Sequence, residues 1–141
     1  MKNTLLASAI LLASSVLANS AQAQSVFTAT VNNNTPVSVT FSSPSGCLGS
    51  NSFSTIGSGG SQTSNITSPY STSNGCSIRY TRSDNGRYCS WNATRTRSSS
   101  TASWNYPTIN TSSSGSGVTC SANITSVSSN GNWSASFTIA P

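Results

Sequence analysis

Apolar residues in this chain recur at every second position, in short segments separated by turn-forming residues. Near the C-terminus, Trp133, Ala135, Phe137 and Ile139 alternate with Ser and Thr in this way. A period of two places the apolar side chains on one face of a β-strand. No segment after residue 23 has the i, i+3, i+4 apolar spacing of an amphipathic helix over two turns. The pattern therefore predicts an all-β fold.

Three hairpins follow from the positions of the turn residues between these segments. An Asn-rich turn separates residues 27–31 from 37–41, and Asn-Gly pairs, the strongest short hairpin signal, occur at Asn85-Gly86 and Asn130-Gly131. Taking these residues as the loops fixes the register of each hairpin. The pairs expected to face each other are Phe27 with Phe41, Tyr80 with Trp91, and Ile124 with Phe137.

Further strands are expected near Ser52–Ile56, Thr63–Thr67 and Ala102–Ile109, which brings the total to about eight. Short strands at this spacing, with turn signals between them, favour a sandwich. We expect one disulfide-stapled antiparallel β-sandwich over residues 24–141, of immunoglobulin-like or jelly-roll type. The sequence does not distinguish these two topologies.

Four cysteines, Cys47, Cys76, Cys89 and Cys120, allow three pairings. In the expected middle hairpin Cys89 faces Arg82, which lies about 20 Å along the strand from Cys76. Disulfide Cα atoms lie within about 7 Å of each other, which argues against a Cys76–Cys89 bridge. Of the other two pairings, Cys47–Cys76 with Cys89–Cys120 closes the shorter loops and is preferred to Cys47–Cys89 with Cys76–Cys120. An even number of cysteines in a small exported domain is typical of disulfides.

Residues 1–23 have the three parts of a secretory signal peptide. Lys2 gives a positive start, Leu5–Leu17 is a short apolar run, and Ala21-Gln22-Ala23 matches the cleavage pattern. The run is shorter than the roughly 20 apolar residues that a spanning helix needs. We expect cleavage of 1–23 and export of the remainder to the periplasm or the extracellular space. The alanine-rich style of this segment is typical of bacterial proteins.

The residues that catalysis needs are almost absent. Charged residues make up 5% of the chain, where an ordinary soluble domain has roughly a quarter, and there is no histidine. Asp84 is the single acidic side chain, and its place before a tight turn suits a capping role. Paired-carboxylate and Ser-His-Asp mechanisms therefore lack their residues. We expect no enzyme activity and no cofactor, and without histidine or a CxxC motif no metal site.

The positive charge of residues 24–141 is confined to one predicted hairpin. One interpretation is that its arginines keep a nearly uncharged chain soluble and protect edge strands from pairing. The other is an anion-binding patch, with Tyr88 among the arginines, for lipid phosphates, acidic polysaccharide or nucleic acid. Nucleic acid ranks last, because five arginines are few and nothing else in an exported chain supports it. The arginines are Arg79, Arg82, Arg87, Arg95 and Arg97.

Trp104-Asn105-Tyr106 is the best candidate for exposed aromatic surface. Pro107 follows directly, and a proline restricts a segment to an edge strand or a loop. Trp91 and Trp133, in contrast, fall on inward-facing positions. Of the 118 residues from 24 to 141, 61 are Ser, Thr or Asn. Aromatic rings among hydroxyl and amide groups suit sugar recognition, because rings cover the apolar faces of a sugar and polar groups bond its hydroxyls.

The function expected first is a secreted, non-catalytic binding or adhesion module that recognises a glycan or another cell-surface component. A first alternative is a structural subunit of an extracellular filament or matrix, in which 27–31 and 133–139 exchange between copies by strand addition. A second is a membrane-active effector that binds anionic lipid through the arginine hairpin. Arginines that converge beside residues 104–106, which we call the aromatic loop, would favour ligand binding. Scattered arginines would favour a structural or solubilising role. The candidate ligand-binding residues are Trp104, Asn105, Tyr106, Arg79, Arg82, Arg87, Arg95, Arg97 and Tyr88.

Overall fold

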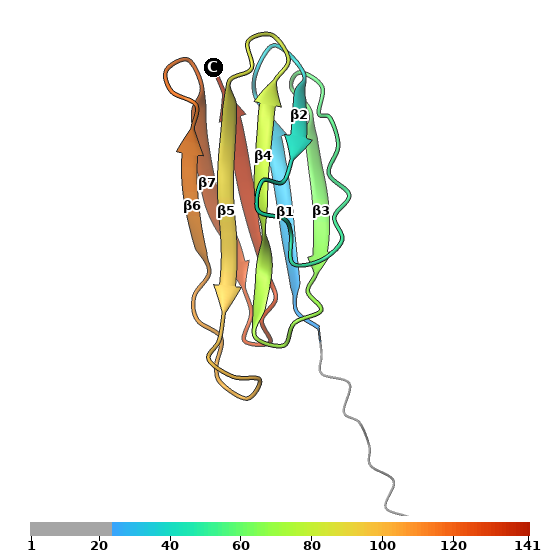
Figure 1. The fold of residues 1–141 in the computed structure, drawn as a ribbon, viewed down its shortest axis with the longest axis vertical. Coiled ribbons are helices and arrows are strands. Elements are labelled where there is room, and N and C mark those ends of the chain that lie inside the picture. The colour runs from blue at the N-terminus through green and yellow to red at the C-terminus, as the bar shows by residue number, and fades with distance from the viewer. Residues whose placement is uncertain (1–23) are drawn as a thin grey trace, which may run out of the picture.

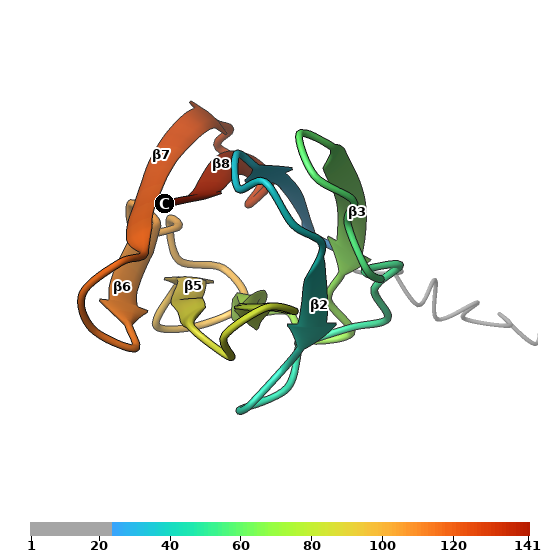
Figure 2. The same cartoon turned by 90° about the horizontal axis from the view of Figure 1, so that it is seen from above.

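The computed structural model describes residues 24–141, which form two four-stranded β-sheets packed face to face (Figure 1, Figure 2). The expected signal peptide, residues 1–23, lies outside the described residues. The sheets have the strand orders β3-β1-β8-β7 and β2-β4-β5-β6. The predicted sandwich of about eight strands is confirmed. The strands are β1 (Val26–Asn33), β2 (Val39–Ser42), β3 (Ser61–Thr67), β4 (Ser73–Arg82), β5 (Tyr88–Thr96), β6 (Thr108–Ser113), β7 (Thr119–Val127) and β8 (Trp133–Ala140).

Alternating side chains from both sheets form a core between them. Phe27 of β1 stacks on Trp133 of β8 with ring centroids 4.1 Å apart, and Trp91 of β5 meets Phe137 of β8 at 5.3 Å. Both tryptophans are buried, as their inward positions predicted. Asn74 of β4 accepts a hydrogen bond of 2.7 Å from Trp133 Nε1, so this buried N–H has a partner. Burial of side chains this large contributes about 1.5–3 kcal/mol each and is the main stabilising term.

The predicted N-terminal hairpin is wrong. β1 pairs antiparallel with β3 and parallel with β8, whereas β2 belongs to the other sheet and pairs with β4. Phe27 therefore lies beside Trp133 and not opposite Phe41. The Asn-rich segment 34–38 crosses between the sheets, and the buried Asn33 side chain fixes the crossing by donating to three backbone carbonyls. The parallel pair also departs from the fully antiparallel sandwich that we expected.

Both Asn-Gly hairpins are present, but their registers differ from the predicted ones. The shift is two residues in β4–β5 and in the part of β7–β8 beyond its bulge, and one residue between that bulge and the turn. A two-residue type I′ turn needs positive φ at both positions. In the described chain no residue other than glycine has positive φ, so Gly86 (71°) and Gly131 (98°) each end a longer loop. A shift of two keeps every side chain on its predicted face. The observed pairs are Tyr80 with Cys89, Ile78 with Trp91, Ala122 with Phe137 and Ile124 with Ala135.

The other three expected strands have mixed outcomes. Thr63–Thr67 lies within β3, as predicted. Ser52–Ile56 is not a strand, because the Gln62 side chain of β3 bonds to two of its backbone groups in place of a ladder. In Ala102–Ile109 the strand begins at Thr108, and the residues before it form the loop that the proline indicated.

The two disulfides are the preferred pairing, Cys47–Cys76 and Cys89–Cys120. The first joins the β2–β3 connection to β4, and the second joins β5 of one sheet to β7 of the other. Structural disulfides are typical of oxidising compartments, which agrees with an extracellular type of environment. Residues 24–141 contain no helix that is long and apolar enough to cross a membrane.

Candidate binding surface

Three connections meet at one end of the sandwich, which we call the loop end (Figure 1). They are residues 68–72 between β3 and β4, 97–107 between β5 and β6, and 128–132 between β7 and β8. Tyr70 and Tyr106, on the first two connections, are 55% and 68% exposed. They are the most exposed large hydrophobic side chains of the described chain. Apolar surface that meets solvent is therefore concentrated at this end.

Trp104, the first candidate of the aromatic loop, is held by neighbouring groups. The Arg97 guanidinium lies over its ring at 4.7 Å from the ring centroid, and that of Arg95 lies at 5.7 Å. The indole also packs against Gly131, where a Cβ would come within 2.5 Å of the ring. Trp104 therefore joins the 97–107 connection to the β7–β8 turn, and of the aromatic loop Tyr106 is the ring left free for a ligand.

Arg95 and Arg97 bind the backbone of the loop end. Arg95 is 4% exposed and donates to the carbonyl oxygens of Asn105 (2.8 Å), Ser128 (2.8 Å) and Asn132 (3.0 Å). Its burial lowers the pKa of the Arg95 guanidinium. Arg97 donates through Nε to the carbonyl oxygen of Ser71 at 2.7 Å. These two arginines thus tie the three connections to one another.

The other three arginines lie away from the aromatic loop. Arg79 is on the outer face of β4 and stacks over the Tyr88 ring at 4.2 Å. Arg82 and Arg87 lie at the opposite end of the sandwich, at the β4–β5 turn. Arg82 pairs with Asp84 (2.7 Å), and its hydrogen bond and charge hold the pKa of that carboxyl below its ordinary value. Such dispersal is the outcome that favours a structural or solubilising role for these arginines.

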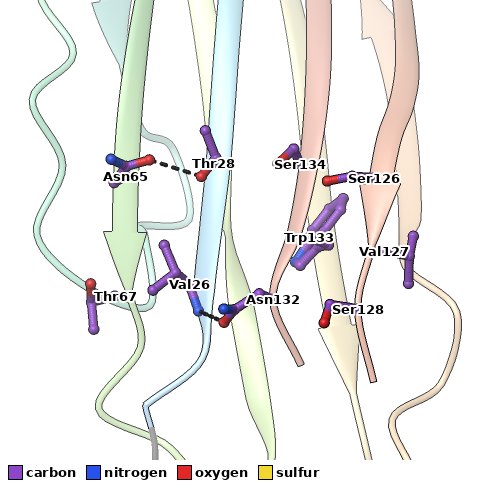
Figure 3. Close-up of a pocket in the computed structure, with 10 residues that line it drawn as sticks. All are labelled: Val26, Thr28, Asn65, Thr67, Ser126, Val127, Ser128, Asn132, Trp133 and Ser134. Atoms are coloured by element: carbon purple, nitrogen blue, oxygen red, sulfur yellow. Dashed lines mark hydrogen bonds between the residues drawn. The ribbon is translucent and has the colours of Figure 1, made fainter. Parts of the chain in front are cut away.

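A groove of about 500 Å³ lies on the outer face of the β3-β1-β8-β7 sheet, next to the loop end (Figure 3). Its polar lining side chains are neutral. Thr28 Oγ1 donates to Asn65 Oδ1, and the Val26 N–H donates to Asn132 Oδ1, both at 2.8 Å. Val127, 39% exposed, forms an apolar wall. The lining residues are Val26, Thr28, Asn65, Thr67, Ser126, Val127, Ser128, Asn132, Trp133 and Ser134.

The groove continues into a regular surface that we call the hydroxyl–amide face. In three successive rows across the four strands, every outward position is Ser, Thr or Asn. Neighbouring strands are about 4.8 Å apart and successive rows about 7 Å. Thr30 and Thr63 share a hydrogen bond of 2.8 Å across two strands of this face. From β3 to β7 the rows are Asn65-Thr28-Ser134-Ser126, Thr63-Thr30-Ser136-Asn123 and Ser61-Asn32-Thr138-Ser121.

Sequence reasoning did not single out this face. The sequence pattern that indicates this face is the alternation itself, because the outward residues are the ones that alternate with the buried core residues of β1 and β8. The face can exchange hydrogen bonds with a neutral ligand, since hydroxyl and amide groups both donate and accept. Among residues 24–141 no group of His, Cys, Asp and Glu side chains is arranged to hold a metal ion. Neither a known protein-family model nor a curated protein matches this chain.

Proposed function

We propose that the protein is a secreted, non-catalytic adhesion module, of bacterial type, that binds a neutral glycan on a cell surface or in a matrix. The ligand lies in the groove and along the hydroxyl–amide face. The observation that carries this proposal is the uninterrupted neutral lining of both, with hydroxyl and amide groups on every outward position of three rows. The exposed Tyr106 and Tyr70 at the adjacent loop end add ring surface that can stack on a sugar.

A neutral glycan fits this surface better than an anion does. No arginine lies on the four strands of this sheet, and the two arginines of the loop end already bind backbone carbonyls. Sugar hydroxyls, like those of Ser and Thr, are at once donors and acceptors. Each such bond contributes only about 0.5–1.5 kcal/mol net, so useful affinity needs several bonds from an extended chain. A repeating face meets that need, because successive sugar units find similar groups.

The test is a binding comparison, by glycan array and polysaccharide pull-down, between two matched variants. Thr30→Val removes a cross-strand hydroxyl pair from the hydroxyl–amide face, and Thr94→Val removes the equivalent pair (Thr94–Thr108, 3.2 Å) from the other sheet. We expect Thr30→Val to bind about three- to tenfold more weakly, the loss of one hydrogen bond, and Thr94→Val to bind as the wild type does. Tyr106→Ala should also weaken binding. Equal binding by both valine variants, or no binding of any neutral glycan by the wild type, contradicts the proposal.

A further inference from the structure

The outer edges of the two sheets carry no charge. The edge strands are β2, β3, β6 and β7, and none of them contains an Arg, Lys, Asp or Glu. The arginines of regular strands are on β4 and β5, which are interior strands, so the interpretation that they protect edges from pairing is wrong. An edge strand presents unpaired N–H and C=O groups, and proteins commonly protect it with charge, proline, a bulge, short length or a covering segment.

On one side of the sandwich the edges are protected by other means. β2 has four residues. The edge of β3 is covered by segment 50–56, which runs beside it in Figure 1. The Ser52 N–H donates to Ser64 Oγ at 2.9 Å, and Gln62 Nε2 donates to the Ser52 carbonyl oxygen at 2.9 Å. The β2–β3 side is therefore closed to a further strand.

The opposite side is formed by β6 and β7. These strands belong to different sheets, lie beside each other (Figure 2) and are not paired in a common sheet. β7 has a bulge between Ile124 and Ser126. β6 lacks charge, proline and a bulge, and its six residues pair regularly with β5. Within the described chain this is the edge best suited to accept a strand.

Apolar side chains are incompletely buried on this side, as Phe41 and Phe53 also are on the β2–β3 side. Inward side chains of β1 and β8, such as Phe27 and Phe137, are fully buried. Ile109 of β6 and Ile124 of β7 pack against the core but are only partly buried. A strand added at this side would remove the remaining apolar surface from water, which contributes roughly 25 cal/mol per Å².

We propose that a second copy of this chain docks on the β6–β7 side, with β6 of one copy pairing antiparallel with β6 of the other about a two-fold axis. Such a contact uses the same surface on both copies and is self-complementary. Two uncharged edges meet without repulsion, whereas a partner steered by charge would find no opposite charge on β6 or β7. β1 and β8, the segments expected to exchange between copies, are bonded on both sides and are not available without unfolding.

The test is the mass of the exported protein in solution, measured by light scattering and sedimentation over a range of concentrations. Thr111 of β6 is exposed, lies opposite Trp91 and is near the centre of the edge. An inward-pointing charge there should block pairing. We expect a dimeric wild type, and at least tenfold weaker association for Thr111→Lys and for Thr111→Glu. Mixing these two variants should restore dimers, a result that a folding defect cannot give. Thr40→Lys, at an exposed position of β2, is the control and should remain dimeric.

A wild type that stays monomeric at the highest concentration overturns the proposal, and so does a Thr111→Lys variant that dimerises as the wild type does. A mixture of the lysine and glutamate variants that stays monomeric overturns the β6–β6 geometry. None of these outcomes depends on glycan binding, so the failure of one proposal does not imply the failure of the other.

Discussion

Replacement of Arg95 by methionine tests whether this arginine holds the connections of the loop end together, a role that we call the clamp. Methionine retains an unbranched apolar stem but has no hydrogen-bond donor. Arg95 is 4% exposed and makes three hydrogen bonds of 2.8, 2.8 and 3.0 Å to carbonyl oxygens of two connections. Arg95→Met therefore leaves three carbonyls without this partner and removes the hydrogen bonds that join the 97–107 connection to the β7–β8 turn.

The expected loss of stability follows from these contacts. A hydrogen bond to a charged group contributes about 1.5–3 kcal/mol, so three would contribute about 4.5–9 kcal/mol. Two effects offset part of this sum: the variant no longer buries a guanidinium without a carboxylate partner, and water can reach the partly buried carbonyls. We expect Arg95→Met to lower the free energy of unfolding by about 3–5 kcal/mol. With a urea m-value of 1–3 kcal/mol/M, the unfolding midpoint should fall by roughly 2 M.

Urea unfolding followed by tryptophan fluorescence measures this change, since Trp104 lies against the clamp and two other tryptophans report on the core. Arg87→Met is the matched control, because Arg87 is exposed in the β4–β5 turn and should change stability by less than about 0.5 kcal/mol. Arg95→Lys should recover part of the loss, since one ammonium cannot reach all three carbonyls as a planar guanidinium does. A loss below about 1 kcal/mol for Arg95→Met would refute the clamp, because water would then satisfy the carbonyls equally well.

Three further predictions concern stability. Replacement of both Cys89 and Cys120 by alanine should cost about 3–4 kcal/mol, from a closed loop of 31 residues, and an unchanged melting temperature would contradict it. The pKa of Asp84 is lower in the folded chain, so its contribution is present above its unfolded pKa and is lost as pH falls through the folded value. An acid titration of unfolding free energy should therefore be flatter for Asp84→Asn. Asn74→Leu leaves the buried Trp133 N–H unpaired and should cost about 1–3 kcal/mol in urea unfolding, whereas wild-type stability would contradict this.

Alternation predicted which side chains face the core, and it did so for physical reasons. A period of two fixes the face of each residue regardless of which strand lies beside it. Trp91 and Trp133 were placed in the core correctly for this reason. The disulfide pairing also survived the shifted register. Cys89 faces Tyr80, four residues from Cys76, or about 13 Å along the strand, which is still too far for a bridge.

Strand partners were predicted less well, because alternation contains no information about them. The apolar face of β1 can pack equally well with β2, β3 or β8 beside it. The deciding contacts are nonlocal: the Asn33 side chain holds carbonyls of two separate segments and turns the chain toward the other sheet. The register of the two Asn-Gly hairpins depends on whether asparagine adopts positive φ, which the dipeptide alone does not determine.

In the candidate site, too, the local structure could be predicted from the sequence and the tertiary contacts could not. Pro107 predicted that residues 104–106 form a loop, but it did not predict which groups contact Trp104. Arg95 and Arg97 are close to Trp104 because β5 ends where the 97–107 connection folds back, and this depends on the tertiary arrangement. The hydroxyl–amide face could have been predicted, since its residues are the complement of the buried set in β1 and β8.

The two proposals share one physical cause, and a charge placed at either surface should separate them. Because the strands of the sheet face and the β6 edge contain no charged side chain, both surfaces are neutral, which permits both a neutral ligand and a neutral copy. Thr30→Lys puts a charge on the hydroxyl–amide face and should weaken binding of a short oligosaccharide at least tenfold while dimers persist. Thr111→Lys should do the reverse, since a monovalent ligand gains nothing from a second copy. If each variant lost both properties, the face and the edge would be one surface, and the separation argued from the fold would be wrong.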